Sequence, residues 1–226
     1  LVDADLGLAN ADLLCGVQPL ATIEQCLALR RPVLDCAVEV RGRFTLIPGA
    51  SGVARLADLD ASDRGWLLGE IESIANTVDW LIVDTGAGLG LNTVAFAAAA
   101  DRVLVVTTPE PPSMADAYGM IKTLAPRVEP GVVQTVVNQA RDEEDARGVW
   151  LRLDRVSRAF LAGELPLAGW LPYDASLPQA VRSRVPLLEQ SPNSPAARSI
   201  LRLAQQMRGP SPIANPMQSR RHGAPP

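Results

Sequence analysis

The sequence predicts an α/β fold: a doubly wound, mostly parallel sheet with helices on both of its faces. Short apolar runs rich in β-branched residues alternate with helical segments, and the joins between them are short. Most of these runs lack a polar alternation, which is typical of parallel strands buried on both faces. At 226 residues and 47% hydrophobic content, the chain is long enough for one such domain.

The expected elements alternate as far as residue 207. Strands are predicted over residues 1–3, 44–47, 80–84, 103–107, 132–138 and 167–171. Helices are predicted over residues 22–29, 62–78, 91–100, 113–124, 143–161, 175–184 and 195–207, with serine N-caps at Ser62 and Ser113. Residues 208–226 are rich in proline and hold little that could pack, so a disordered tail is predicted after a domain spanning residues 1–207.

Composition argues against several functional classes. The net charge of −4 provides no bulk basic field, so nucleic acid is not an expected partner. The three cysteines show no C-x-x-C spacing, which argues against a disulfide framework or a zinc site and fits a reducing cytoplasm. His222 is the only histidine and lies in the tail, so histidine-based catalysis is not expected. No apolar run approaches the ~20 residues that a membrane span needs.

Acidic residues follow two of the expected strands. The apolar run over residues 81–83 ends at Asp84 and continues into Thr-Gly-Ala-Gly, and Asp3-Ala4-Asp5 follows the apolar start of the chain. The carboxyl ends of parallel strands meet at one edge of a sheet, where a metal ion and phosphates can bind. Glycines at that edge allow close approach of the backbone to a phosphate. The structural alternatives are a capping aspartate in a Gly-rich turn at Asp84 and a solvent-facing acidic turn at Asp3-Ala4-Asp5.

Polar groups follow two later strands. Asn138 ends the strand over residues 132–138, where its amide could both donate to and accept from a base edge. The turn Pro172-Tyr173-Asp174 closes the last strand and could present backbone groups to an adenine. The structural alternatives are an asparagine that caps a turn and a common proline-containing turn.

Four segments together resemble the MinD/ParA family of deviant-Walker ATPases. Residues 1–12 resemble its switch I, residues 82–88 its switch II, and residues 107–118 the segment after the next strand. The Ile-Pro-Gly-Ala-Ser-Gly run over residues 47–52 and the Thr-Gly-Ala-Gly form of switch II resemble the flagellar number-and-placement branch (FlhG/YlxH/FleN-like). The resemblance spans roughly residues 1 to 207, and the combination is more specific than any single motif.

The resemblance implies roles for matching residues at an ATP and Mg²⁺ site. Asp5 would activate the hydrolytic water, Asp3 and Asp84 would serve the magnesium shell, and Gly88 would lie beside the γ-phosphate. The family's Gly-Gly-Val-Gly-Lys-Thr loop, which supplies the phosphate nest and its lysine, does not occur in these 226 residues. Lys122, the only lysine, is expected in mid-helix without glycines around it and cannot replace that loop.

A second set of implications concerns the base and the partners. Asn138 with Pro172 and Asp174 would hold the adenine. Family members form an ATP-dependent sandwich homodimer and attach to membranes through a C-terminal amphipathic helix. The flagellar branch works with a signal-recognition-type GTPase and with basal-body components. The resemblance therefore implies a cytoplasmic protein, or one peripheral at the inner face of the cell membrane.

Two further expectations follow from the absence of this loop. The chain opens inside a strand, which indicates an N-terminally truncated fragment that does not hydrolyse ATP measurably. The loop's own strand lies in the middle of the family's sheet, so we expect two unpaired strand edges and an aggregation-prone chain. Alternative functions are a partition ATPase, which would need a basic DNA-binding surface, and a non-catalytic interaction module that retains the fold.

The last predicted helix, over residues 195–207, has two interpretations. Ile200, Leu203, Ala204 and Met207 form a helical stripe, with arginines elsewhere around the helix. A basic amphipathic helix of this kind can make a weak contact with an anionic membrane surface. The favoured interpretation is a terminal helix packed on the sheet, because the stripe is short and has no aromatic residue.

Overall fold

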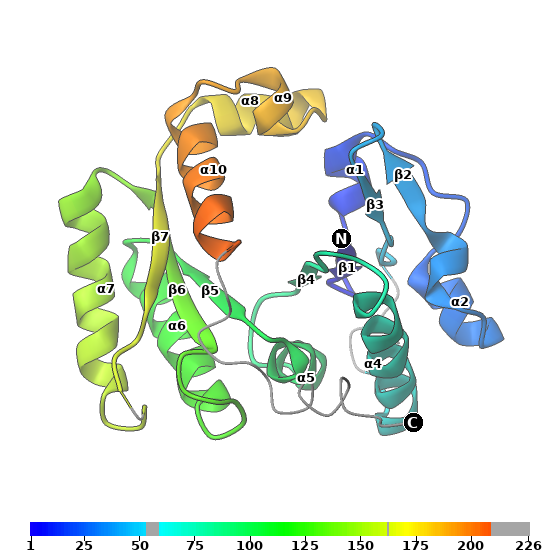
Figure 1. Ribbon diagram of the computed structural model, residues 1–226, viewed down its shortest axis with the longest axis horizontal. Coiled ribbons are helices and arrows are strands. Elements are labelled where there is room, and N and C mark those ends of the chain that lie inside the picture. The colour runs from blue at the N-terminus through cyan, green and yellow to red at the C-terminus, as the bar shows by residue number, and fades with distance from the viewer. Residues whose placement is uncertain (53–58, 162, 209–226) are drawn as a thin grey trace, which may run out of the picture. The chain divides into compact units, whose positions relative to one another are not determined.

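A computed structural model describes residues 1–52, 59–161 and 163–208 (Figure 1). The chain forms two compact units. Unit 1 comprises Leu1–Ala99 and Pro178–Gln190, and unit 2 comprises Ala100–Leu177 and the chain from Ser191 onward. All but the first residue of the expected tail, 208–226, lies outside the described residues.

The sheet of unit 1 is small and parallel. Strand β1 (Val2–Ala4) pairs in parallel with β4 (Val83–Thr85), so that Asp3 stands opposite Asp84. On the other side of β1, Ile47 forms a parallel bridge to Val2. Ile47 directly follows β3 (Phe44–Leu46), which makes an antiparallel hairpin with β2 (Val38–Val40). Among the described strands, β4 therefore has a partner on one edge only.

Helices of unit 1 pack around this sheet. They are α1 (Ala11–Cys15), α2 (Ile23–Leu29), the 3-10 helix η1 (Val33–Cys36), α4 (Ala61–Ala75), α5 (Leu91–Ala99), most of α8 (Ser176–Ser183) and α9 (Leu187–Gln190). The apolar faces of α2, η1, α4 and α5 share one core with β1, in which Val2, Ile23 and Leu67 are fully buried, whereas α1 packs in a smaller cluster with β2 and β3. The core thus packs directly against the strand that carries Asp3.

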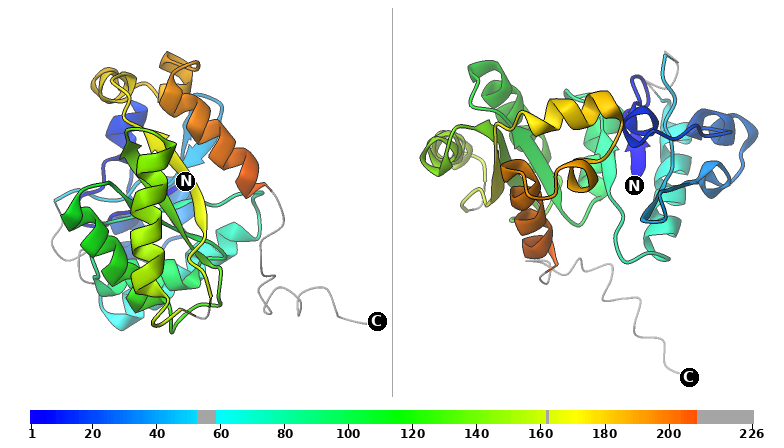
Figure 2. Two further views of the ribbon diagram at one scale, coloured as in Figure 1. Left: turned by 90° about the vertical axis from the view of Figure 1, so that its left-hand side faces the viewer. Right: turned by 90° about the horizontal axis from the view of Figure 1, so that it is seen from above.

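Unit 2 holds a larger parallel sheet, in the order β5-β6-β7. The strands are β5 (Val103–Thr107), β6 (Val133–Ala140) and β7 (Leu167–Pro172), and the helices are α6 (Pro111–Leu124), α7 (Glu143–Ser157) and α10 (Pro195–Met207). Two successive right-handed crossovers in one direction place α6 and α7 on the same face. Helix α10 covers the opposite face, alongside β7 (Figures 1 and 2).

Helix α10 packs on the sheet of unit 2. A Cβ atom built on Gly169 of β7 would lie 3.5 Å from Leu203 Cδ1, an ordinary van der Waals contact. Ile200, Leu203 and Met207 are half-buried, while Leu201 and Arg202 are exposed, and so is Ala204, which the sequence had placed on the stripe. The stripe predicted from the sequence therefore faces β7, as the favoured interpretation held. Among the described residues, no helix is both long and apolar enough to cross a bilayer.

Most expected elements are present, and the differences have local causes. Strand β2 was not predicted, because it is only three residues long and its hairpin turns through Arg41 and Gly42, both at positive φ, without an Asn-Gly or Asp-Gly signal. Helix α4 begins at Ala61, where Asp60 rather than Ser62 is the N-cap. Helices α1 and α9 were missed because five and four residues show no helical period.

Two further boundaries differ. Helix α6 begins at Pro111, a residue suited to the first helical turn, two positions before the expected cap Ser113. The Ser113 hydroxyl instead accepts the N–H of Thr108 at 2.9 Å and so fixes the turn after β5. Strand β6 does not end at Asn138 but continues to Ala140.

Candidate functional site

The acids of unit 1 meet at the carboxyl end of its parallel strands. Parallel pairing in register places Asp3 of β1 directly opposite Asp84 of β4, and Asp5 follows β1 immediately. The three carboxylates thus share one edge of the sheet, as the position of the two apolar runs predicts. Their surroundings differ, and these differences decide what each can do.

Asp3 is a buried carboxylate with backbone partners. Its side chain accepts three backbone N–H groups: that of Asp5 at 3.2 Å through Oδ1, and those of Asn10 at 3.0 Å and Ala11 at 2.9 Å through Oδ2. The residue is only 2% exposed. It therefore organises the segment between β1 and α1, and binding a cation directly would require it to give up some of these hydrogen bonds.

Asp5 lies against the glycine that follows β4. A Cβ atom on Gly86 would stand 2.9 Å from Asp5 Oδ1, closer than real contacts allow. Asp5 Oδ1 also accepts the N–H of Leu8 at 3.2 Å. Gly86 is therefore needed so that the Asp5 carboxylate can approach the backbone after β4. Gly88, two residues on, has a φ of 89°, which favours glycine.

Asp84 is the exposed member of the group. Its carboxyl group is partly desolvated, and the charges of Asp3 and Asp5 lie close by; these effects, in that order, raise the pKa of Asp84 above its ordinary value. A divalent cation at this edge would relieve the repulsion. Uncompensated like charges are typical of functional sites.

The carboxylates of Asp3, Asp5 and Asp84 offer the kind of oxygen ligand that Mg²⁺ binds, but they are not arranged as a complete metal site. Carboxylate oxygens are the ligands that Mg²⁺ prefers, and it usually keeps several waters. Within residues 1–52, 59–161 and 163–208, no group of three or more acidic, histidine or cysteine side chains has metal-site geometry. Asp84, with Asp5 beside it, is therefore the better candidate to hold a hydrated magnesium ion.

Unit 2 brings the two predicted base-binding groups to one edge. Ala140 pairs with Pro172, and the ladder between β6 and β7 shifts register between Val137 and Ala140. Asn138 lies inside this bulge, where its Oδ1 accepts the N–H of Gln139 at 2.9 Å. Gln139 has a φ of 59°, so the bulge is a strained feature at the end of the strand.

Asp174 has a different environment from the acids of unit 1. Its Oδ1 accepts the N–H of Ser176 and its Oδ2 the N–H of Ala196, both at 2.9 Å. These hydrogen bonds lower its pKa to about 2. Both carboxylate oxygens of Asp174 thus already accept backbone N–H groups.

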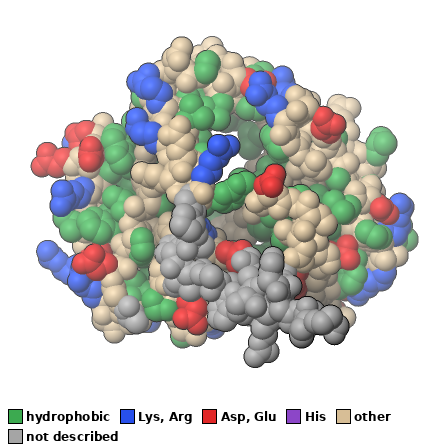
Figure 3. Space-filling view, viewed as in Figure 1, with side chains coloured by type: hydrophobic (Ala, Val, Ile, Leu, Met, Phe, Trp, Pro, Cys, Tyr) green, Lys and Arg blue, Asp and Glu red, His purple; other side chains and the backbone are tan. Residues whose placement is uncertain are grey.

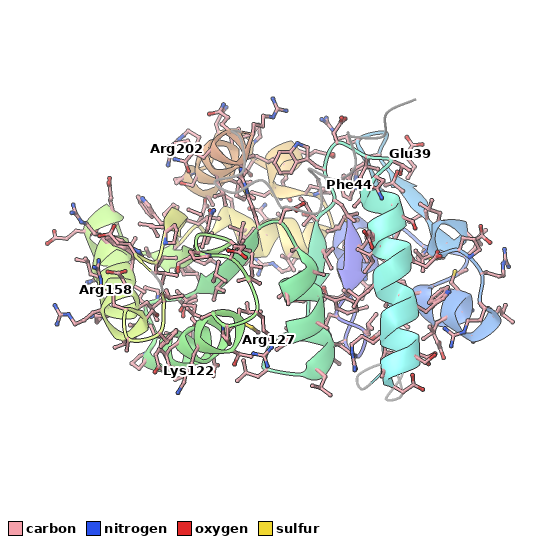
Figure 4. The ribbon with its side chains drawn as sticks, turned by 60° about the horizontal axis from the view of Figure 1, so that its bottom comes forward. Glu39, Phe44, Lys122, Arg127, Arg158 and Arg202 are labelled. Atoms are coloured by element: carbon pink, nitrogen blue, oxygen red, sulfur yellow. The ribbon has the colours of Figure 1, made fainter. Side chains whose placement is uncertain are left out.

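Lys122 contacts an aromatic ring of its own helix. It extends from α6 of unit 2 (Figure 4). Its ammonium nitrogen lies 6.0 Å from the ring centroid of Tyr118, one turn earlier on the same helix. Lys122 thus lies within a helix, as the sequence predicted, and its ammonium group faces its own helix.

Gly49 is a residue whose importance sequence reasoning understated. A Cβ atom there would lie 2.6 Å from Ala9 Cβ and 2.7 Å from the backbone oxygen of Asp3. The glycine therefore lets the segment after β3 touch the backbone that carries Asp3. The Pro48-Gly49 pair after a strand marked a turn, but only the fold shows which backbone comes close.

Parallel strands that deliver acids, an amide and a glycine-lined turn to their carboxyl ends define the nucleotide-binding α/β class. No family model matches the chain. The antiactivator FleN of Pseudomonas aeruginosa is 33% identical over 216 residues, covering 96% of this chain and 77% of its own length. The flagellum site-determining protein YlxH of Helicobacter pylori is 32% identical over 203 residues, covering 89% and 68%.

Solved structures agree on the fold. The cell-division ATPase MinD of Pyrococcus furiosus superposes with a TM-score of 0.73 at 24% identity, covering 91% of this chain and 83% of that one. At this identity the likeness shows the fold alone. The relatives FleN and YlxH establish that the chain belongs to the MinD/ParA family, in its flagellar number-and-placement branch.

Proposed function

We propose that this protein is a MinD-like ATPase that regulates the number or placement of flagella. The observation that carries this proposal is the 33% identity to FleN over 96% of the chain. The similarity to YlxH, whose name describes flagellum site determination, supports the same function. The retained acids at the edge of unit 1 favour a nucleotide-dependent regulator over a scaffold.

The proposed ligands are ATP and Mg²⁺. In unit 1, Asp84 and Asp3 would serve the magnesium shell, Asp5 would orient and deprotonate the attacking water, and Gly88 would lie beside the γ-phosphate. Mg²⁺ supplies charge neutralisation of the phosphates when bound. The closeness of Asp5 to Gly86 and the raised pKa of Asp84 support these roles.

In unit 2, Asn138 and the turn over residues 172–174 would hold the adenine. Their common edge, set by the Ala140–Pro172 pairing, supports this. Because the 226 residues hold no Gly-rich lysine loop, we propose that this chain alone does not hydrolyse ATP measurably. Turnover by the chain that Asp5→Ala abolishes would refute the latter proposal.

Assembly and location follow the family. We propose an ATP-dependent homodimer, a signal-recognition-type flagellar GTPase and basal-body components as partners, and a cytoplasmic protein with a weak membrane-surface contact. Nucleic acid is not a proposed partner, because the net charge is −4 and basic and acidic side chains are interspersed on the face in Figure 3. The packing of α10 on β7 leaves little of its apolar stripe for a membrane.

A genetic experiment tests the function directly. Deletion of the gene in its own flagellated host, followed by counting and mapping flagella by electron microscopy, should change their number or position, and the wild-type gene should restore both. Defective plasmid or chromosome inheritance with normal flagella would favour a partition ATPase. Full rescue by Asp5→Ala and by Asp84→Asn would favour a non-catalytic interaction module.

A further inference from the structure

The turn over residues 172–174 is fixed from both sides. On the side of β6, the N–H of Tyr173 donates to the backbone oxygen of Ala140 at 3.1 Å, next to the bulge that carries Asn138. On the other side, the Asp174 carboxylate accepts N–H groups from Ser176 and from Ala196, which is 22 residues away in sequence. One side chain therefore fastens the turn to the start of α10.

The hydrogen bonds of the Asp174 carboxylate serve to fasten the turn to the start of α10. The N–H groups of Ala196 and Ser176 are the main reason that its pKa falls to about 2. Ser194 is the N-cap of α10 and accepts the N–H of Ala197 at 3.2 Å. Asp174 is thus part of the cap of a helix that begins far along the chain.

Helix α10 is itself held in place, so it can fix the position of the turn. Ala196 and Ala197, in its first turn, are buried against unit 2. Leu203 lies over Gly169 of β7 in mid-helix. At the far end, the Arg102 side chain donates to the backbone oxygen of Met207 at 3.0 Å. The helix is held at its start, middle and end, so a group tied to its start has a fixed position.

We propose that Asp174 is a positioning residue for base recognition: it locks the turn over residues 172–174 to α10, and it does not itself contact the nucleotide. The proposal rests on the proposed function for the identity of the ligand. It adds that α10, a helix outside the base-binding edge, determines how rigidly the turn meets the base. The turn's backbone groups, together with Asn138, then provide the selectivity.

The first experiment needs no nucleotide. Hydrogen exchange of the chain is compared between wild type, Asp174→Asn and the control Asp142→Asn, which alters an N-cap aspartate of α7 in the same unit. An asparagine amide in place of the Asp174 carboxylate could accept only one of the two N–H groups, so exchange over residues 173–177 and 196–199 should rise roughly fivefold or more. The control should raise exchange only near the start of α7.

The second experiment tests selectivity by measuring the dissociation constants of ATP and GTP for the same three proteins. Loss of positioning should reduce the preference for ATP over GTP by roughly three- to tenfold in Asp174→Asn, and Asp142→Asn should keep the wild-type ratio. A merely structural defect would weaken both nucleotides equally. Asp174→Glu, which keeps the charge, should recover part of the preference.

The outcomes separate the two proposals. If Asp174→Asn leaves exchange over residues 173–177 at the level of the control, the positioning role is overturned. An unchanged ATP-to-GTP ratio beside raised exchange also overturns it. If wild type binds neither nucleotide, the nucleotide part of the proposed function fails for this chain, and the exchange measurement alone decides whether Asp174 holds the turn.

Discussion

Both units have acids at the carboxyl ends of parallel strands, but the surroundings of these acids shift their pKa values in opposite directions. In unit 1, partial desolvation and then the nearby charges of Asp3 and Asp5 raise the pKa of Asp84. In unit 2, Asp174 is surrounded by N–H donors, and its pKa falls to about 2. The difference shows that an acid at a strand end is poised for a cation only where the backbone leaves its charge uncompensated.

In its hydrogen bonding, Asp3 resembles Asp174 more than it resembles its neighbour Asp84. Both accept backbone N–H groups that start a helix or an ordered turn. The expectation that Asp3 and Asp84 act alike at a metal is therefore best tested by asking whether their removal changes stability in the same direction. The following predictions sharpen or break the comparison, beginning with the largest effect.

Gly49→Ala should destabilise unit 1 by about 2–3 kcal/mol or more, because the new methyl group would meet Ala9 Cβ and the Asp3 backbone. Urea denaturation would measure the change. Gly69→Ala in α4 is the matched control: its Cβ would meet nothing within 4 Å, and alanine favours a helix interior by up to ~1 kcal/mol. Equal effects of the two substitutions would contradict the close approach at Gly49.

Asp3→Asn should destabilise the protein by about 1–3 kcal/mol, because a buried amide cannot accept all three N–H groups that the carboxylate accepts. Hydrogen exchange should rise at Asn10 and Ala11 first. A purely ligating Asp3 would behave differently, since its replacement would leave the stability of the metal-free protein unchanged or raise it.

Asp174 should contribute stability that depends on pH. Its folded pKa of about 2 lies below the ordinary value near ~3.9, so its contribution is complete above pH ~4 and is lost as the pH falls from there towards 2. Asp174→Asn should cost about 1 kcal/mol at neutral pH. The cost should shrink as the pH falls through that window, and a constant difference between the two proteins would contradict the assignment.

Asp84→Asn should have the smallest effect and the opposite sign. Removing a charge that is repelled by Asp3 and Asp5 should stabilise the metal-free protein at neutral pH, by less than about 1 kcal/mol because the residue is exposed. Its raised folded pKa means that wild type should gain stability as the pH falls through that pKa, and the variant should lack this gain. Destabilisation by Asp84→Asn at neutral pH would show that the Asp84 carboxylate stabilises the fold, as the Asp3 carboxylate is expected to do.

The sequence by itself determined the class of fold, the order of most strands and helices, and the acids that lie at the carboxyl ends of β1 and β4. Apolar runs of β-branched residues and the glycines behind Asp84 suffice for that, because they reflect local propensity and burial. The helix over residues 195–207 was predicted with its observed bounds, since Ser194, Pro195 and the apolar stripe are local signals. The same pattern also indicated that the stripe would pack on the sheet.

Only the tertiary structure decided what each acid does. A carboxylate looks the same in sequence whether it accepts three N–H groups, as Asp3 does, or repels its neighbours, as Asp84 does. The partner of Asp174 at Ala196 and the close approach of Gly49 to Asp3 join segments far apart in the chain. Charge compensation and backbone contact depend on distances between such segments, which no local pattern encodes.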